Sequence, residues 1–239
     1  MLRLRETPLL GSREALASLP EGKLLINTIN AHSYNTAQKD AVFAEALCRG
    51  DVLIPDGAGI VKAVRYLKKE SVERIAGADL FAWEMERLNA KGGICFFLGS
   101  SEKVLELIRR RAAADYPSIR VITLSPPYKA EFSDAENRAM IDAVNAAAPD
   151  LLWIGMTAPK QEKWAYTHLA ELTVNCHIGT IGAVFDFYAG TVRRAPVSWQ
   201  KHGFEWLYRL LKEPRRMWRR YLIGNTVFIW NILKEKYNF

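Results

Sequence analysis

The stretch DVLIPDGAGIV, residues 51–61, has the order of a buried strand, a turn and a helix. Residues 52–54 are aliphatic, as in buried strands, and Pro55, Asp56 and Gly57 are turn-forming residues. The sequence here predicts one strand–turn–helix unit of a parallel sheet. Asp56 has two interpretations, because Asp-Gly is favourable in a turn and a carboxylate at the end of a strand is also well placed for catalysis.

The same alternation continues on both sides of this stretch and predicts an α/β fold, a Rossmann-like, mostly parallel sheet flanked by helices. The expected strands cover residues 24–29, 52–54, 94–98, 120–124, 151–154 and 174–178, and the expected helices cover residues 36–49, 58–67, 78–90, 102–115, 134–147 and 160–172. A chain of 239 residues is long enough for one such catalytic core, placed at residues 1–192, and an appendage at residues 193–239.

Basic charge is concentrated in the appendage. The formal net charge is +7, and residues 193–239 alone hold 11 Lys and Arg against three Glu. The appendage also holds four of the seven tryptophans: Trp199, Trp206, Trp218 and Trp230. This composition predicts a basic amphipathic helical appendage that associates with a membrane surface, although a solvated basic surface has the same pattern.

Two features bear on the location of the protein. The apolar region 221–233 is interrupted by polar residues and is shorter than the roughly 20 residues of a spanning helix, which predicts a peripheral position on the bilayer. Cys48, Cys95 and Cys176 are an odd, widely spaced set, expected to be reduced core residues of a cytoplasmic protein. The N-terminus also lacks the continuous apolar run of a signal peptide.

The segments that follow the expected strands are rich in glycines, hydroxyls and amides. In chain order they are TINAHSYN, PDGAG, GSS, SPPY, GMTAPKQE and GTIGAVFDFYAG. Since parallel strands end at one edge of the sheet, these segments are expected to form a site for a polar, phosphorylated ligand.

Individual side chains in these segments have local alternatives. Thr28 and Asn30 face the same side of the first strand, but both residues also cap and end elements. Gly99 precedes two serines that can cap the following helix. Lys160 and Gln161 stand at a helix start that could hold an anion, and Pro-Lys-Gln-Glu is also simply a good helix start.

Several common chemistries lack their sequence signals. No glycine-rich loop follows the first strand, no Gly-x-Ser-x-Gly elbow is present, and the four histidines are scattered. There is no Asp-x-Asp motif either. No metal or other cofactor is therefore expected.

Arginines form a pattern in the appendage. Arg216, Arg219 and Arg220 are spaced at i, i+3 and i+4, and Arg209 lies two turns earlier on about the same face. Guanidinium groups suit phosphates because they can bind two oxygens at once. The alternative is again a solvated basic face.

Taken in order, five segments resemble the WecG/TagA/CpsF glycosyltransferase family. They are PDGAGIV, RIAGADLF at 74–81, FFLGSS, APDLLWIGMTAPKQEKW at 148–164, and FDFYAGTVRRAPVSWQKHGFEWLYRLLKEPRRMWRR at 185–220. The resemblance implies inverting, metal-independent transfer of a hexose or N-acetylhexosamine-type sugar from a UDP-sugar to an undecaprenyl-diphosphate-linked sugar. It also implies a place in cell-surface polysaccharide synthesis, at the inner face of the bacterial plasma membrane.

The resemblance also assigns roles to residues. It implies that Asp56 is the base. The residues implied to bind substrate are Thr28, Asn30, Gln161, Arg209, Arg216 and Arg219. Further binding candidates lie in the segments that follow the strands, here called the rim, and they are Gly57, Gly99 and Lys160. One departure concerns the loop before Lys160, where many members have Gly-x-Gly-x-Pro and this chain has Thr157 at the second glycine.

Two alternatives from other classes remain open: a nucleotide-sugar-binding module without catalysis, and a nucleic-acid-binding protein that uses the basic appendage. We expect no nucleic acid partner, since the polar rim would then have no purpose. An exposed apolar appendage would also allow homo-oligomers away from the membrane.

Overall fold

Six parallel strands form one sheet in the order β2-β1-β6-β5-β3-β4. The computed structural model describes residues 1–237, with the exception of the Lys201 side chain. The strands are β1 (Leu24–Ile29), β2 (Val52–Pro55), β3 (Gly93–Gly99), β4 (Ile119–Leu124), β5 (Leu151–Gly155) and β6 (His177–Thr180). The predicted parallel α/β sheet is therefore confirmed.

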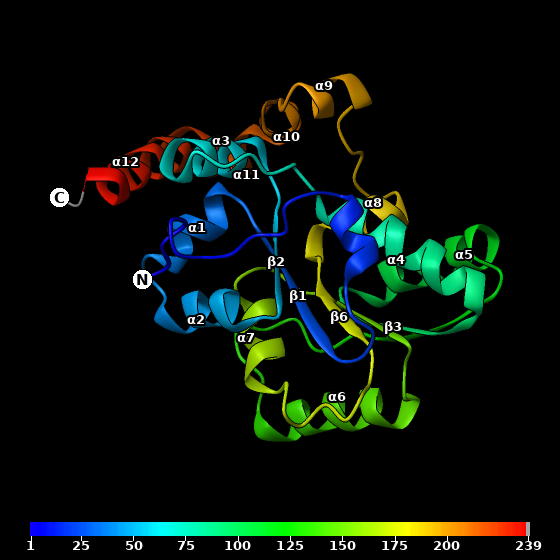
Figure 1. Ribbon diagram of the computed structural model, residues 1–239. Helices are drawn as coiled ribbons and strands as arrows, with labels where there is room; N and C mark the ends of the chain where they lie inside the picture. The colour runs from blue at the N-terminus through cyan, green and yellow to red at the C-terminus, as the bar shows by residue number, and fades with distance from the viewer. Residues whose placement is uncertain (238–239) are drawn as a thin grey trace.

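Helices cover both faces of the sheet (Figure 1). A short 3₁₀ helix, η1 (Glu14–Ser18), precedes the sheet. The core helices are α1 (Ala31–Ala37), α2 (Ala41–Arg49), α3 (Ala58–Lys68), α4 (Gly77–Lys91), α5 (Glu102–Asp115), α6 (Asp134–Ala147), α7 (Lys160–Thr167) and α8 (Gly182–Ala189). The appendage contains α9 (Val197–Lys201), α10 (Glu205–Lys212), α11 (Pro214–Trp218), a π-helical turn η2 (Arg219–Ile223) and α12 (Gly224–Tyr237).

Alternation along the strands divides the core into two layers. Leu151 and Trp153 of β5 pack in the cluster that contains residues of α4, α5 and α8. Leu152 and Ile154 point to the opposite face and pack with residues of α6 and α7. Successive side chains of a strand point to opposite faces of the sheet. A parallel strand that is buried on both faces is therefore apolar on both faces.

The last helix of the appendage belongs to a third apolar cluster. Phe228 and Ile232 of α12 pack with residues of α1, α2 and α3. The rings of Tyr34 and Phe228 meet edge to face with centroids 5.4 Å apart, and the Asn35 side-chain amide donates to the Gly224 carbonyl at 2.7 Å. The appendage is thus helical and packed on the core, while the boundary at residues 192 and 193 stays a prediction.

Some predicted bounds are wrong. Residues 36–49 do not form one helix, because α1 ends at Ala37 and Asp40 begins α2 by accepting the Phe43 N–H at 2.9 Å. The predicted strand 174–178 starts only at His177, since both neighbouring strands begin opposite that residue. The helix predicted at 160–172 ends at Thr167 and continues as turns.

The structure also bears on the cysteines and on the apolar appendage. Cys95 and Cys176 are buried free thiols, but Cys48 is exposed, so its prediction as a core residue is wrong. In the helical pattern of α2, Cys48 follows the buried Leu47 and lies outside the stripe that packs on the sheet. Within residues 1–237, no helix combines the length and apolar character needed to cross a membrane.

Candidate active site

The strand order decides which segments are neighbours at the carboxyl edge of the sheet. The segment after β2, with Asp56, lies at one end, next to the segment after β1, with Thr28 and Asn30. The segments after β6 and β5 follow, and those after β3 and β4 lie farthest from Asp56. One edge carries all six segments, as predicted, but Gly99 lies well across the sheet from Asp56.

Backbone contacts fix the position of Asp56. Its N–H donates to the Ile29 carbonyl at 2.8 Å, which ties the turn after β2 to the end of β1. Gly57 has φ +121°, a conformation that strains any residue with a side chain. Turn geometry thus explains Gly57, but it does not explain why a carboxylate precedes it.

The half-buried Asp56 side chain lies in a charged environment. Burial raises its pKa to about 6, and the negative charge of Glu205 adds to this shift. Arg74 and Arg194 act in the opposite direction and favour the ionised form. Asp56 is therefore mostly ionised at neutral pH and close to the pKa that suits a general base.

Glu205 joins three segments that are distant in the sequence. Its carboxylate accepts from Arg74, which precedes α4, and from Arg194, which follows α8, each at 3.3 Å. All three side chains are only about one-fifth exposed, at 19–23%. Because Glu205 lies in α10, its pair with Arg74 attaches the appendage to the core beside Asp56, and its pair with Arg194 holds the start of the appendage at the same place.

Three guanidinium groups at this junction have buried N–H atoms without an acceptor. They are Nη2 of Arg194, Nε of Arg209 and Nε of Arg220, and none has a hydrogen-bond partner within the described part of the chain. Burial lowers the pKa of Arg220, and its charged neighbours include Arg209, Arg216 and Asp56. Buried donors are almost always paired in native proteins, so this cluster is suited to an anionic ligand.

The arginines of the appendage do not all face this cluster. Arg219 is exposed, with its guanidinium over the Trp218 ring at 5.3 Å, and Arg216 is exposed and pairs with Glu213 at 2.9 Å. Arg220 is more buried than either Arg216 or Arg219. The π-helical turn at 219–223 changes the α-helical spacing on which the prediction of one shared face depended.

Thr28 and Asn30 lie beside the Asp56 turn. Asn30 caps α1, because its side-chain oxygen Oδ1 accepts the N–H groups of His32 at 3.0 Å and Ser33 at 3.1 Å. Thr28 is half-buried and pairs with Ile54 in the sheet register. The local capping alternative therefore holds for the Asn30 oxygen, while its amide nitrogen and the Thr28 hydroxyl remain candidates for binding.

Gln161 connects two neighbouring loops of the rim. Its side-chain oxygen Oε1 accepts the N–H groups of Met156 at 3.1 Å and Gly182 at 3.0 Å. Its amide donates to Glu162 at 2.9 Å, and burial raises the pKa of Glu162 to about 7. Three of the four hydrogen-bonding positions of the Gln161 amide are thus used within the protein. Substrate binding by Gln161 stays a prediction.

Lys160 points to the other end of the sheet. Its ammonium donates to the Lys129 carbonyl at 2.5 Å and lies over the Phe132 ring, both in the connection after β4. Gly99, with φ +125°, lies so close to the Gly155 carbonyl that a side chain there would clash. Ser101 caps α5, as the local alternative predicted. Neither Lys160 nor Gly99 is brought close to Asp56.

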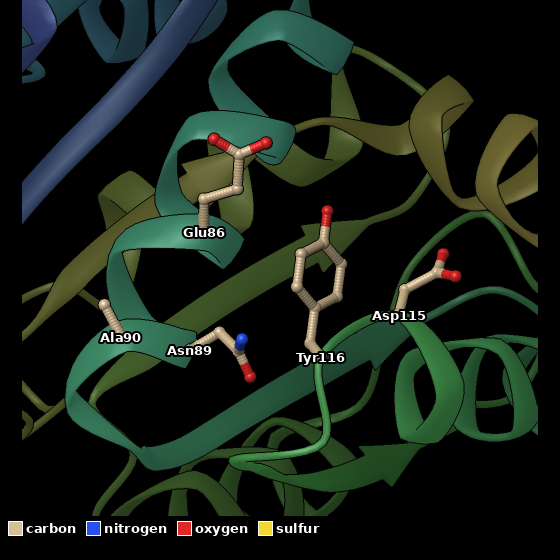
Figure 2. A pocket seen from close by; sticks show the side chains of 5 residues that line it. All are labelled: Glu86, Asn89, Ala90, Asp115 and Tyr116. Atoms are coloured by element: carbon tan, nitrogen blue, oxygen red, sulfur yellow. The ribbon is translucent and has the colours of Figure 1, made fainter.

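Among residues 1–237, no three His, Cys, Asp or Glu side chains gather in a way that could hold a metal ion. Figure 2 shows a hollow between the end of α4 and the end of α5, with Glu86, Asp115 and Tyr116 around it. It lies at the amino edge of the sheet, away from Asp56, and its two carboxylates do not suit an anion.

Sequence reasoning missed three residues of the site. Arg74, Arg194 and Glu205 lie within the quoted segments, but no spacing rule places them together, because they meet only through the fold. Arg220 belongs to the arginine pattern of the appendage, but the resemblance does not include it among the substrate-binding residues.

The amino-acid sequence is similar to those of known proteins. The model described as "Glycosyl transferase WecG/TagA/CpsF family" matches residues 8–239. Two similar proteins are both named N-acetylglucosaminyldiphosphoundecaprenol N-acetyl-beta-D-mannosaminyltransferase. The one from Bacillus spizizenii is 32% identical over 88% of this chain and 79% of its own length. The one from Staphylococcus aureus is 28% identical over 92% of this chain and 84% of its own length. The chain belongs to the WecG/TagA/CpsF family of glycosyl transferases.

Proposed function

We propose that this protein transfers a hexose or N-acetylhexosamine-type sugar from a UDP-sugar to a prenyl-diphosphate-linked sugar, with inversion and without a metal. The observation that carries the proposal is the meeting of a carboxylate of raised pKa, Asp56, with buried, unpartnered guanidinium donors of Arg194, Arg209 and Arg220. A base beside an anion site is what single displacement of a nucleoside diphosphate requires.

The step can be assigned to these groups. An acceptor hydroxyl attacks the anomeric carbon, and its proton passes to the Asp56 carboxylate. The bond from the anomeric carbon to the diphosphate oxygen breaks, and UDP leaves with the electron pair. The arginine donors stabilise the charge that develops on the diphosphate. Because fixed cations can provide this stabilisation, a metal ion is not required for the step.

The relatives' names support the acceptor and the stereochemistry. Both name an N-acetylglucosaminyl-diphospho-undecaprenol acceptor and a β-D-mannosaminyl product. A β linkage made from an α-linked donor requires inversion at the anomeric carbon. We therefore infer an undecaprenyl-diphosphate-linked acceptor for this chain and a place in cell-surface polysaccharide synthesis. The donor sugar remains for the experiment, since Thr157 departs from the usual loop.

The acceptor also implies a location. A lipid-linked acceptor stays in the bilayer, so we infer that the protein works as a peripheral protein at the inner face of the plasma membrane. The appendage supports this inference, because it presents exposed Trp218 and Trp230 and also contributes Arg209 and Arg220 to the anion site. Membrane docking and assembly of the active site would then depend on the same helices.

The test is UDP release by the full-length protein with a panel of UDP-sugars and a short prenyl-diphosphate-linked N-acetylglucosamine in detergent. We expect release with one donor, only when the acceptor is present, and a loss of about 10²–10⁴-fold in Asp56→Asn. Full activity in that variant would remove Asp56 as the base. No release with any donor would contradict the proposed transfer itself.

A further inference from the structure

The outer face of α3 carries cations that the proposed reaction does not use. Lys62, Arg65 and Lys69, here called the α3 basic patch, line a hollow around Tyr66. The three side chains are exposed, and none forms an ion pair with a residue that the structure describes. Lys236 of α12 adds a fourth cation, 5.4 Å from the centre of the Tyr66 ring. This face therefore holds concentrated positive charge that no carboxylate of the described residues neutralises through an ion pair, and the contacts of Lys69 and Lys236 with Tyr66 leave their charge in place.

The patch adjoins an apolar surface of the appendage. Figure 1 shows α3 alongside α12, and the Lys236 ammonium donates to the Tyr66 carbonyl at 3.3 Å. The exposed apolar side chains of the appendage include Leu211, Trp218, Leu222, Ile223, Ile229 and Trp230, each at least 42% exposed. The inward side of the same helices is already filled, since Met217, Phe228 and Ile232 are buried.

We propose that the α3 basic patch and these apolar side chains form one docking surface for an anionic lipid bilayer. Lys62, Arg65 and Lys69 would bind lipid phosphates while the apolar side chains enter the interfacial layer. Each part matches one layer of such a membrane, cations with anionic headgroups and tryptophans with the acyl boundary. The inference rests on the proposed function and extends it, because it assigns membrane binding to the core as well as to the appendage.

The location of α3 gives this surface a consequence for the active site. The helix begins directly after the Asp56–Gly57 turn. Along a helix with a rise of about 1.5 Å per residue, Arg65 lies roughly 13 Å from Asp56. A patch bound to headgroups would therefore hold the base at a fixed distance from the lipid-linked acceptor, through one rigid element.

The test measures binding of the full-length protein to vesicles, without any reaction. Vesicles of phosphatidylcholine alone are compared with vesicles that contain phosphatidylglycerol, over a salt series. The variant Lys62→Gln, Arg65→Gln, Lys69→Gln removes the patch. A matched control, Arg110→Gln, Arg120→Gln, Arg138→Gln, removes three exposed arginines from α5, β4 and α6 at the other end of the sheet. Thermal unfolding confirms that both variants fold.

We expect the wild type to prefer anionic vesicles, with an affinity that falls as salt rises. The patch variant should lose about fivefold in affinity for each cation, or on the order of 100-fold in all, whereas the control should bind like the wild type. The patch variant should also keep its rate on acceptor in detergent and lose rate on acceptor in vesicles.

Three results would overturn the proposal: wild-type affinity in the patch variant, an equal loss in the control, or binding that does not depend on lipid charge. If the patch variant lost affinity for a DNA duplex and kept its affinity for vesicles, the patch would belong to a nucleic-acid site. That result would also overturn the proposal. Since vesicle binding needs no donor sugar, failure of the transferase assay would leave this test intact, and the reverse is equally true.

Discussion

Asp56 shows how one residue can satisfy a turn and a reaction together. The Asp-Gly pair is explained by a backbone that needs a positive φ at Gly57, and the sequence predicted that turn. The raised pKa of Asp56 depends instead on burial and on Glu205, 149 residues away by number, so no local pattern could show it. Composition and resemblance selected the residue, but only the fold supplies its electrostatic environment.

The pKa of Asp56 predicts a pH dependence. A base works in its ionised form, so kcat/KM should fall as the pH is lowered through about 6, where Asp56 is protonated. In Glu205→Gln, the charge that helps to raise this pKa is absent and Arg74 and Arg194 are released, so the acid limb should move to lower pH. The control Glu106→Gln on α5 should leave the limb in place. An unshifted limb in Glu205→Gln would show that another group controls it.

Arg220 and Arg219 give a second prediction at this scale. Arg220 belongs to the arginine cluster of the site and has a buried Nε without a hydrogen-bond partner, whereas Arg219 is exposed over Trp218. Arg220→Gln should lower kcat/KM by about 10²–10³-fold, the usual loss for one donor to a developing negative charge, and Arg219→Gln should change it only a few-fold. The measurement is steady-state UDP release, with circular dichroism to check folding. A larger loss of kcat/KM in Arg219→Gln than in Arg220→Gln would favour Arg219, the residue that the resemblance implies.

At the scale of elements, strands were predicted better than helix ends. Continuous apolar runs such as residues 151–154 identify buried strands because both faces of the sheet are covered. The break between α1 and α2 was missed, since the cap by Asp40 depends on one side-chain bond and not on periodicity. The π-helical turn was also missed, because the predicted arginine face assumed α-helical spacing throughout. The different directions of Arg219 and Arg220 were missed with it.

The loops after β5 and β6 provide a prediction about Gln161. If Gln161 mainly holds these loops, Gln161→Ala leaves two backbone N–H groups without an acceptor and should reduce the free energy of unfolding by about 1–3 kcal/mol. Lys160→Gln, its neighbour in the same helix, should have little effect on stability. Urea unfolding of both variants provides the measurement. A Gln161→Ala variant of normal stability and raised KM for donor would indicate direct substrate binding instead.

At the scale of the whole molecule, the strand order was beyond prediction. Alternating strands and helices predict a parallel sheet and one shared carboxyl edge, but they do not say which strands are neighbours. That order separates Gly99 and Lys160 from Asp56 and leaves Thr28 and Asn30 beside it. Neighbour relations arise from long-range packing, and the contribution of the appendage to the site arises in the same way.

Packing of α12 on the core gives a prediction for the whole chain. Phe228 is 6% exposed and contacts Tyr34, so Phe228→Ala should lower the free energy of unfolding by about 3–5 kcal/mol. The adjacent Ile229, 60% exposed, should tolerate Ile229→Ala within about 0.5 kcal/mol in solution. Denaturant unfolding followed by tryptophan fluorescence measures both. Equal, small effects would mean that α12 contributes little to the stability of the core.

The place of β6 has a consequence for how the chain reaches this fold. The last strand in the sequence lies in the middle of the sheet, between β1 and β5. Until residues 177–180 leave the ribosome, β2-β1 and β5-β3-β4 are two separate half-sheets, each with an open edge that can pair with another chain. The sheet therefore closes only after the other five strands have been made, and α12 completes the third apolar cluster after that. Until then, the residues of α1, α2 and α3 in that cluster lack the apolar cover of Phe228 and Ile232.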